Sequence, residues 1–529
     1  MLRTLRSEAA LRFLVAFLPA AVVLISSSRR YLPFMADDAF ISLRYADRLL
    51  EGHGLSWTDG QPVEGYSNLL WILLCAAVGT VAPLPLAARV VGVASALGAF
   101  AAIAAWGARS RARVPFALAA ALALSLSSPI VVWAIGGLEQ CLVMALLAVA
   151  LLSIWEAPAG ARRELWPAGA ALAALVLTRP DSLLFVAAFA VALVMRDGLG
   201  AARAWWPVLI GAPLLAYAAQ LGFRLLYYGD WVPNVARVKV AWKVARLAGG
   251  WEYVSSGWRV LVAPLGLLAL GSLSVLGVPG RRRALGLLLL PPLAWLGYVV
   301  AVGGDIFPAR RQLVAVVLLG VLGGVLGLAA TWERGVRFRA GALFAAGAAV
   351  LLNARLTPRD QGARDARHEL WEWEGEVSGR FFAEAFAAFQ PTIAVDSAGC
   401  VPFFSRLPAI DMLGLNDREI PRRRGTERAT GSVSFDLHDI GDADYVLSRR
   451  PDLILPCGPL GADAACDVVP WTHRLFQHRE FRARYAPMSF RGLVPFQAEG
   501  TVWVRKDSPV ALETTESTLT VKAPLLARS

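Results

Sequence analysis

Two adjacent carboxylates, Asp37 and Asp38, stand at the start of a segment whose apolar residues recur every four positions. This spacing predicts an amphipathic helix over 38–51 that lies on a membrane surface. The free N–H groups and the dipole at a helix N-terminus favour ionised carboxylates. Such a carboxylate could take a proton from an acceptor hydroxyl or hold a divalent cation against a phosphate. A simple helix cap with one spare acid explains the pair equally well.

More polar residues follow in the same loop, between glycines. His53 lies in Glu51–Leu55, and Glu64 lies in Pro62–Asn68. These side chains could face a cleft between two surface helices, although a solvated loop accounts for them as well.

Ionisable residues also fall at the outer ends of predicted membrane helices. A charge at membrane depth costs free energy, so its presence indicates function by default, and several on one face are harder to explain as isolated pairs. These residues are Glu139, Arg179, Asp181, Asp305, Arg310 and Arg311.

The predicted outer loop 223–258 is basic and rich in aromatic residues, although short basic loops normally stay in the cytoplasm. A lipid phosphate held on the outer face by charge-assisted hydrogen bonds would compensate these charges. Non-specific attraction to anionic headgroups is the alternative. The basic residues of this loop, with the one directly after it, are Arg224, Arg237, Lys239, Lys243, Arg246 and Arg259.

The elements that must hold these groups are membrane helices. The chain is 57% hydrophobic and only 17% charged, with a mean hydropathy of +0.53, whereas soluble proteins are about 25% charged. Its apolar blocks are long enough to cross a hydrocarbon core of about 30 Å. The net charge of +12 comes from basic residues between these blocks, which fits membrane topology better than nucleic-acid binding. We expect about eleven spanning helices, near 11–28, 89–107, 114–131, 138–155, 166–178, 181–195, 205–222, 259–277, 284–301, 312–331 and 340–355.

The arginine-rich connections between these helices alternate onto one side, together with the N-terminus. The positive-inside rule makes that side cytoplasmic, and an odd number of crossings then places residues 357–529 on the periplasmic side of an inner (plasma) membrane. The apolar block 68–82 would put arginines on both sides if it crossed. We therefore interpret it as an interfacial or re-entrant helix, with an ordinary spanning helix as the alternative.

The C-terminal third loses the long apolar blocks and gains charge. Short apolar runs such as Thr392–Val395 and Tyr445–Leu447 alternate with helical segments such as 366–389, which predicts a small α/β domain. Cys457 and Cys466 could form one disulfide bond if this domain is periplasmic. The predicted division is a multi-pass α-helical membrane domain at 1–356 with its first outer loop at 29–88, the soluble α/β domain at 357–515 and a disordered tail at 516–529.

With these residues in view, the chain resembles the GT-C class of membrane glycosyltransferases, and within it the mycobacterial terminal arabinofuranosyltransferases and their bacterial relatives. The resemblance covers most of the chain, and the first-loop motif is its most specific part. The segments that carry it are Asp37–Ala46, Glu51–Gly54, Val63–Trp71, Gly137–Glu139, Thr178–Asp181, Pro233–Asn234 with Lys239, Gly303–Asp305 and Ile410–Ile420.

The resemblance implies a polyprenyl-phosphate sugar donor, inversion at the anomeric carbon, and a glycan, lipid or protein acceptor on the periplasmic side. Asp37 or Asp38 would act as base or as ligand of a divalent cation (Mg²⁺, Mn²⁺ or Ca²⁺), and we favour Asp37 as the base. Lys239, Arg310 and Arg311 would neutralise the leaving phosphate. The other substrate-binding residues that it implies are Arg44, Tyr45, His53, Glu64, Tyr66, Asn68, Glu139, Arg179, Asp181, Asn234 and Asp305.

One departure from the family pattern is Gln140–Cys141, where relatives usually have Thr or Ala and then Pro or Leu. Nothing in the sequence names the sugar, which could be arabinose, a hexose or an aminoarabinose. Two other classes stay open. A transporter would predict an internal repeat and broken helices that meet at the midplane, and neither stands out. A non-catalytic envelope or motility assembly factor would keep the fold without the chemistry.

Overall fold

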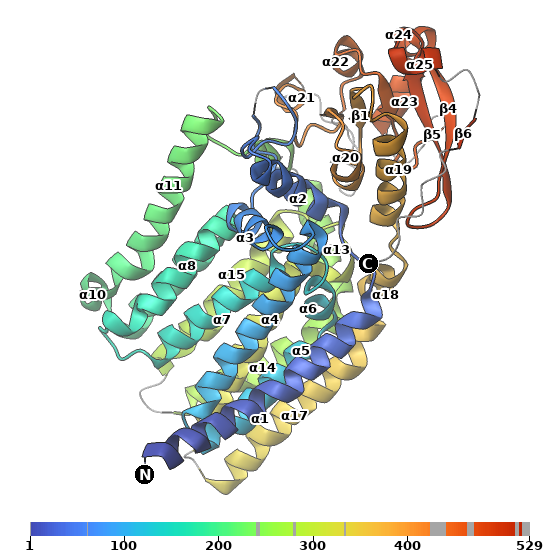
Figure 1. Cartoon of the computed structure of the whole chain (residues 1–529). Coiled ribbons are helices and arrows are strands. Elements are labelled where there is room, and N and C mark those ends of the chain that lie inside the picture. Colours follow the sequence, from blue (N-terminus) through green and yellow to red (C-terminus); the bar gives the residue numbers. More distant parts are fainter. Residues whose placement is uncertain are drawn as a thin grey trace.

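A computed structural model of the protein describes residues 2–60, 62–239, 244–278, 282–332, 335–423, 441–462, 470–513 and 518–520. A bundle of long helices carries a smaller domain with a sheet at one end (Figure 1). The first outer loop lies between the two parts. The main helices of the bundle are α1 (Leu2–Ser28), α4 (Leu84–Ala108), α5 (Val114–Ser125), α7 (Gln140–Glu156), α8 (Trp166–Thr178), α9 (Leu183–Asp197), α11 (Ala212–Tyr227), α14 (Trp258–Leu276), α15 (Leu285–Ala301), α16 (Val314–Ala329) and α17 (Val336–Leu356).

Six helical segments among the described residues are long and apolar enough to cross a membrane, and the chain is a multi-pass helical membrane protein. The predicted number of about eleven crossings is not confirmed. Helices α5, α8 and α9 have 12, 13 and 15 residues, which at 1.5 Å per residue is well short of a core of about 30 Å. The six segments are Ser7–Tyr31, Leu84–Ala108, Leu199–Tyr227, Trp258–Leu276, Pro308–Ala329 and Val336–Arg359.

Helix α16 lies at the centre of the bundle. In the span that contains it, 89% of the apolar window is buried, against 22% to 50% in the other five. Glycines bring it close to α14: a Cβ on Gly324 would lie 2.6 Å from the backbone of Leu267, and one on Gly327 would lie 2.3 Å from the carbonyl oxygen of Gly271. Small residues allow this approach of two helix backbones, which gives tight packing where lipid supplies no hydrophobic drive.

The first outer loop contains two helices. The predicted amphipathic helix is present as α2 (Asp37–Leu50), with residues 39–46 buried. The apolar block that follows forms α3 (Leu69–Gly79), whose 11 residues extend only about 16 Å and cannot cross a membrane by themselves. Figure 1 places α2 under the C-terminal domain.

The C-terminal domain has a six-stranded sheet in the order β2-β1-β3-β5-β4-β6. Strands β1, β2 and β3 are parallel, and β5 joins them antiparallel to β3. Helices α18 (Gln361–His368) and α19 (Trp371–Ala385) precede the sheet, so the predicted single helix over 366–389 is two helices. The strands are β1 (Ile393–Val395), β2 (Ala409–Asp411), β3 (Leu453–Leu455), β4 (Tyr485–Gly492), β5 (Ala498–Arg505) and β6 (Thr518–Thr520).

Some details of this domain differ from the prediction. The apolar run Tyr445–Leu447 lies in helix α22 (Ala443–Ser448), and the strand follows it at β3. Within the predicted tail 516–529, strand β6 pairs with β4, and the other residues of the tail lie outside the described residues. Cys457 is disulfide-bonded, whereas Cys466 lies outside the described residues.

Candidate active site

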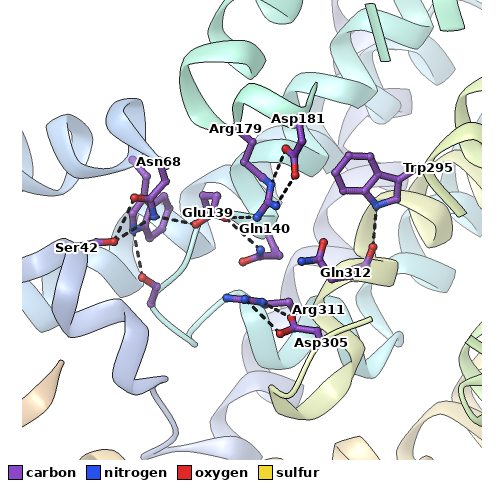
Figure 2. Close-up of polar contacts among 12 residues, drawn as sticks. Ser42, Asn68, Glu139, Gln140, Arg179, Asp181, Trp295, Asp305, Arg311 and Gln312 are labelled. Atoms are coloured by element: carbon purple, nitrogen blue, oxygen red, sulfur yellow. Dashed lines mark hydrogen bonds and ion pairs between the residues drawn. The ribbon is translucent and has the colours of Figure 1, made fainter. Parts of the chain in front are cut away.

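A buried polar cluster lies beneath the first outer loop, where α8 ends and where α7 and α16 begin. Its centre is Glu139, which is 3% exposed and directly precedes α7. One carboxylate oxygen accepts a hydrogen bond from Asn68 Nδ2 at 2.9 Å, and the other accepts one from Arg179 Nη1 at 2.9 Å. Asn68 also contacts Ser42 on α2 at 3.1 Å. The cluster therefore joins the surface helix to the bundle (Figure 2).

Arg179 is held from two sides. It follows α8 in an extended conformation, and its Nε and Nη2 donate to the carboxylate of Asp181 at 3.0 and 2.6 Å. Tyr298 from α15 donates to the same carboxylate at 2.8 Å. A guanidinium fixed in this way presents its donors in one orientation, which suits recognition of an anionic group.

Arg311 forms the opposite side of the cluster (Figure 2). It is 9% exposed, pairs with both oxygens of Asp305, and lies 4.2 Å from the ring centre of Phe307. The charges of Asp38 and Glu139 both act on it. Asp38, at the start of α2, is therefore close enough for its charge to act on Arg311.

The charge of the cluster is negative. Its two arginines against four carboxylates leave a net charge of −2 when all are ionised, counting Arg179, Arg311, Asp38, Glu139, Asp181 and Asp305.

No group of three or more His, Cys, Asp or Glu side chains able to hold a metal ion is present in the part of the chain that the structure describes. The described residues thus do not form a set that fits a divalent cation, and we derive no step through one.

Asp37 has a different environment from Asp38. Its two carboxylate oxygens accept backbone hydrogen bonds from Gly399 at 3.1 Å and from Cys400 at 2.7 Å, where helix α20 (Cys400–Ser405) of the C-terminal domain begins. Burial of the carboxyl group raises the pKa of Asp37 to about 7, and the charges of Asp38 and Asp396 act in the same direction, while the two N–H donors oppose them. Asp37 connects the first outer loop to the C-terminal domain.

Other residues of the first-loop motif make the same connection. Arg44, 4% exposed, donates to the carbonyl oxygens of Trp57 at 2.6 Å, of Leu407 at 2.9 Å and of Pro402. The hydroxyl of Tyr45 contacts Asn416 at 3.1 Å. These side chains of α2 point into the C-terminal domain rather than toward the cluster.

Asn234 fastens a second segment to the same domain. It is the first residue of α12 (Asn234–Lys239), and its Nδ2 lies 2.8, 2.9 and 2.8 Å from the carbonyl oxygens of Gly414, Leu415 and Asp417. Its backbone N–H donates to the carbonyl oxygen of Glu64 at 3.0 Å. The predicted substrate contact is thus a link among three segments.

Glu64 and Tyr66 also have partners inside the protein. Glu64 forms a buried ion pair with Arg224, whose side chain is 2% exposed. Burial raises the pKa of Glu64, and the hydrogen bond from Arg224 opposes this effect. Tyr66 contacts the hydroxyl of Tyr228 at 3.1 Å. Arg224 was predicted to lie in the basic outer loop, but it lies in the last turn of α11. Its charge is compensated by the carboxylate of Glu64 and not by a lipid.

The remaining predicted residues lie apart. Arg310 donates to Tyr253 O and Ser256 Oγ, both at 3.0 Å, and lies 3.4 Å from Asp360, while Arg311 next to it faces the cluster. His53 is exposed. Lys239 ends α12, and its side chain is outside the described part of the structure.

Most of the predicted residues therefore fall into two groups. One forms the polar cluster, and the other docks the C-terminal domain, while Glu64, Tyr66 and Arg310 have other partners. Gln140 and Ser42 of the cluster and Gly399 of the docking contact were not predicted. A signal for Gly399 exists in the sequence, since small residues at 397–399 follow the apolar run 392–395, and a strand followed by a small-residue turn into a helix exposes backbone N–H groups.

Comparison with known proteins gives this geometry a context. The chain is 29% identical over 325 residues to the terminal beta-(1->2)-arabinofuranosyltransferase of Corynebacterium glutamicum, in an alignment that covers 53% of this chain and 46% of that protein. It is 31% identical over 261 residues to the Mycobacterium tuberculosis protein with the same name, which covers 44% of this chain and 40% of that protein. The chain thus spans less than half the length of these curated relatives. Residues 365–505 match a family described as a domain of unknown function (DUF8728).

Among solved structures, ArnT from Cupriavidus metallidurans bound to undecaprenyl phosphate matches with a TM-score of 0.55 at 14% identity, over 75% of this chain and 85% of ArnT. The chain has a GT-C fold. The resemblance to GT-C enzymes and to terminal arabinofuranosyltransferases is confirmed. The sheet-containing C-terminal domain is present as predicted, and it lies next to α2 of the first outer loop (Figure 1).

Proposed function

We propose that this GT-C protein is a glycosyltransferase that moves a sugar from a polyprenyl-phosphate lipid to a glycan, lipid or protein acceptor on the outer face of the membrane. The observation that carries this proposal is the buried cluster of fixed arginines and carboxylates at the outer helix ends. The names of the two curated relatives and the lipid phosphate bound to ArnT support the same reaction class.

We assign the catalytic base to Asp38 rather than to Asp37. Both oxygens of Asp37 accept backbone N–H groups of the C-terminal domain, whereas the charge of Asp38 acts on Arg311. Asp38 takes the proton of the acceptor hydroxyl as its oxygen attacks the anomeric carbon. The bond from that carbon to the phosphate oxygen breaks, and polyprenyl phosphate leaves. A single displacement of this kind inverts the anomeric centre.

The leaving phosphate needs positive charge because the cluster itself is net negative. Arg311 supplies one fixed guanidinium from the cluster, and we propose that Lys239, at the end of α12, supplies a second cation. Such cations stabilise the charge that grows on the phosphate in the transition state. A divalent cation, predicted from the resemblance, is tested below by chelation.

The arrangement in the cell follows the predicted topology. We propose that residues 1–356 form the catalytic domain in an inner membrane with a cytoplasmic N-terminus, and that residues 357–515 form a periplasmic domain that helps to bind the acceptor. The docking bonds of Asp37, Arg44 and Asn234 support a fixed position of this domain beside the cluster.

The test is transfer of radiolabel from polyprenyl-phosphate pentose, aminopentose and hexose donors into membranes that contain the wild-type protein or Asp38→Asn. We expect transfer from one donor class, with a loss of about 10²–10⁴-fold in the variant, the usual contribution of a general base. Asp365→Asn, which removes an exposed carboxylate of α18, is the matched control and should keep full activity. Each donor is also tested with chelator. Full transfer by Asp38→Asn would overturn the assignment of the base, and no transfer by wild type from any donor would favour the assembly-factor alternative.

A further inference from the structure

The first residue of α7, Gln140, has no role in the reaction described above, yet it lies inside the cluster. Its side chain is 5% exposed. Figure 2 shows it between Glu139 and Arg179 on one side and Arg311 on the other. Gln140 is also the position at which the sequence departs from the family pattern.

The orientation of the Gln140 amide is determined by its neighbour. Its Nε2 donates to Glu139 Oε1 at 3.3 Å. A carboxylate only accepts hydrogen bonds, so the nitrogen and not the oxygen of the amide must face Glu139. The amide oxygen Oε1 is then the atom directed away from Glu139. It is buried and has no hydrogen-bond partner among the described residues.

A buried acceptor without a donor costs free energy, and most such atoms in proteins have a partner. The partner here must be a hydrogen-bond donor. An ionised phosphate oxygen only accepts, so the phosphate of a lipid donor cannot satisfy this atom. A sugar hydroxyl can, and the sugar is attached directly to the phosphate that the neighbouring arginine would hold.

We infer that the amide oxygen of Gln140 accepts a hydrogen bond from one hydroxyl of the donor's sugar ring, which makes Gln140 a residue that determines sugar specificity. This inference rests on the proposed glycosyl transfer. It implies that a donor without that hydroxyl leaves the amide oxygen unpaired in the complex. Enzymes discriminate strongly against a substrate that lacks a polar group which the site is built to bind.

The test compares kcat/KM for the donor that wild type uses with kcat/KM for analogues that each lack one ring hydroxyl. In wild type we expect one analogue to lose about ten- to hundredfold, the effect of one unpaired buried acceptor. In Gln140→Leu, kcat/KM for the parent donor should fall by a similar factor. The analogue that wild type discriminates against should then have the same kcat/KM as the parent donor. Gln140→Met, with an unbranched side chain of similar length, repeats the measurement if the leucine variant is inactive. The ratio of parent to analogue within one variant does not depend on the amount of folded protein.

Gln220→Leu is the matched control, because Gln220 is also buried and both of its amide atoms lack hydrogen-bond partners among the described residues, but it lies on α11 outside the cluster. It should keep the wild-type ratio. Two results would overturn the inference and indicate a water at this position. One is that loss of the sugar hydroxyl lowers kcat/KM in Gln140→Leu by the same factor as in wild type, and the other is that Gln140→Leu uses the parent donor at the wild-type rate. Absence of transfer by wild type from every donor would instead overturn the proposed function and this inference with it.

Discussion

Removal of the Asp37 carboxylate should release the C-terminal domain from the first outer loop at one defined point. In Asp37→Ala, the N–H groups of Gly399 and Cys400 lose their acceptors. A buried donor left without a partner costs about 1–3 kcal/mol, which gives about 2–6 kcal/mol for two. Because Asp37 is partly exposed, water can replace part of each bond, and we take the lower end. About 2 kcal/mol corresponds to an opening equilibrium raised roughly thirtyfold.

Hydrogen exchange of the detergent-solubilised protein measures this opening. The peptide that covers the start of α20 should exchange roughly thirtyfold faster in Asp37→Ala than in wild type, whereas peptides from β4 and β5, which lie in the sheet far along the chain from the contact, should not change. Asp38→Ala is the matched control, since it removes the adjacent carboxylate and should leave these amides protected. Equal exchange rates of the α20 peptide in wild type and Asp37→Ala would refute the docking role of Asp37. Faster exchange in Asp38→Ala alone would show that Asp38, and not Asp37, docks the C-terminal domain.

Three further outcomes are expected. The folded-state pKa of Asp37 is raised to about 7 from an ordinary value near 4, so the folded state binds this proton more tightly than the unfolded state. The stability that Asp37 contributes is therefore fully present below about pH 4 and is lost as the pH rises to about 7, and the melting temperature of wild type relative to Asp37→Asn should fall over this range. Glu64→Gln removes one partner of the buried Glu64–Arg224 pair and should lower the free energy of unfolding by about 3–5 kcal/mol. The double variant with Arg224→Met should recover part of this free energy, as measured by thermal unfolding. Gly324→Ala, whose Cβ would lie 2.6 Å from the backbone of α14, should lower the melting temperature, while Gly266→Ala, with nothing within 4 Å, should not.

The sequence predicted those parts of the structure that depend on local patterns. The four-residue spacing in the first loop predicted α2 to within one residue at each end, although residues 39–46 are buried on every face of the helix and not on one face alone. The cost of charge at membrane depth singled out Glu139, Arg179, Asp181 and Asp305, which the fold brings to one cluster.

Contacts between distant segments were not predictable in this way. Asp37 and Cys400 are 363 residues apart, and nothing in the local sequence of either shows that a carboxylate meets a helix start. Asp37 was therefore predicted to be the catalytic base, and Arg44 and Asn234 were predicted to bind substrate. The predicted number of crossings is not confirmed for a related reason: an apolar block of 12 to 15 residues has the same composition whether it faces lipid or neighbouring helices.

Three of the contacts that dock the C-terminal domain, those of Asp37, Arg44 and Asn234, have a side chain on one side only. Asp37, Arg44 and Asn234 supply the side chains, and the domain answers with peptide N–H and carbonyl groups. A peptide group survives nearly every substitution, so mutations at these positions of the domain cannot delete its half of the contact. The side chains of Asn416 and Arg406 also contact Tyr45 and Asp47 across the junction. Tolerance to sequence change should therefore be asymmetric only at the three peptide contacts, where the membrane side is restricted and the domain side is free to vary. The exception is Gly399, where an added Cβ would lie 2.0 Å from the carbonyl oxygen of Asp37. A domain attached in this way could diversify the rest of its surface without losing its position beside α2.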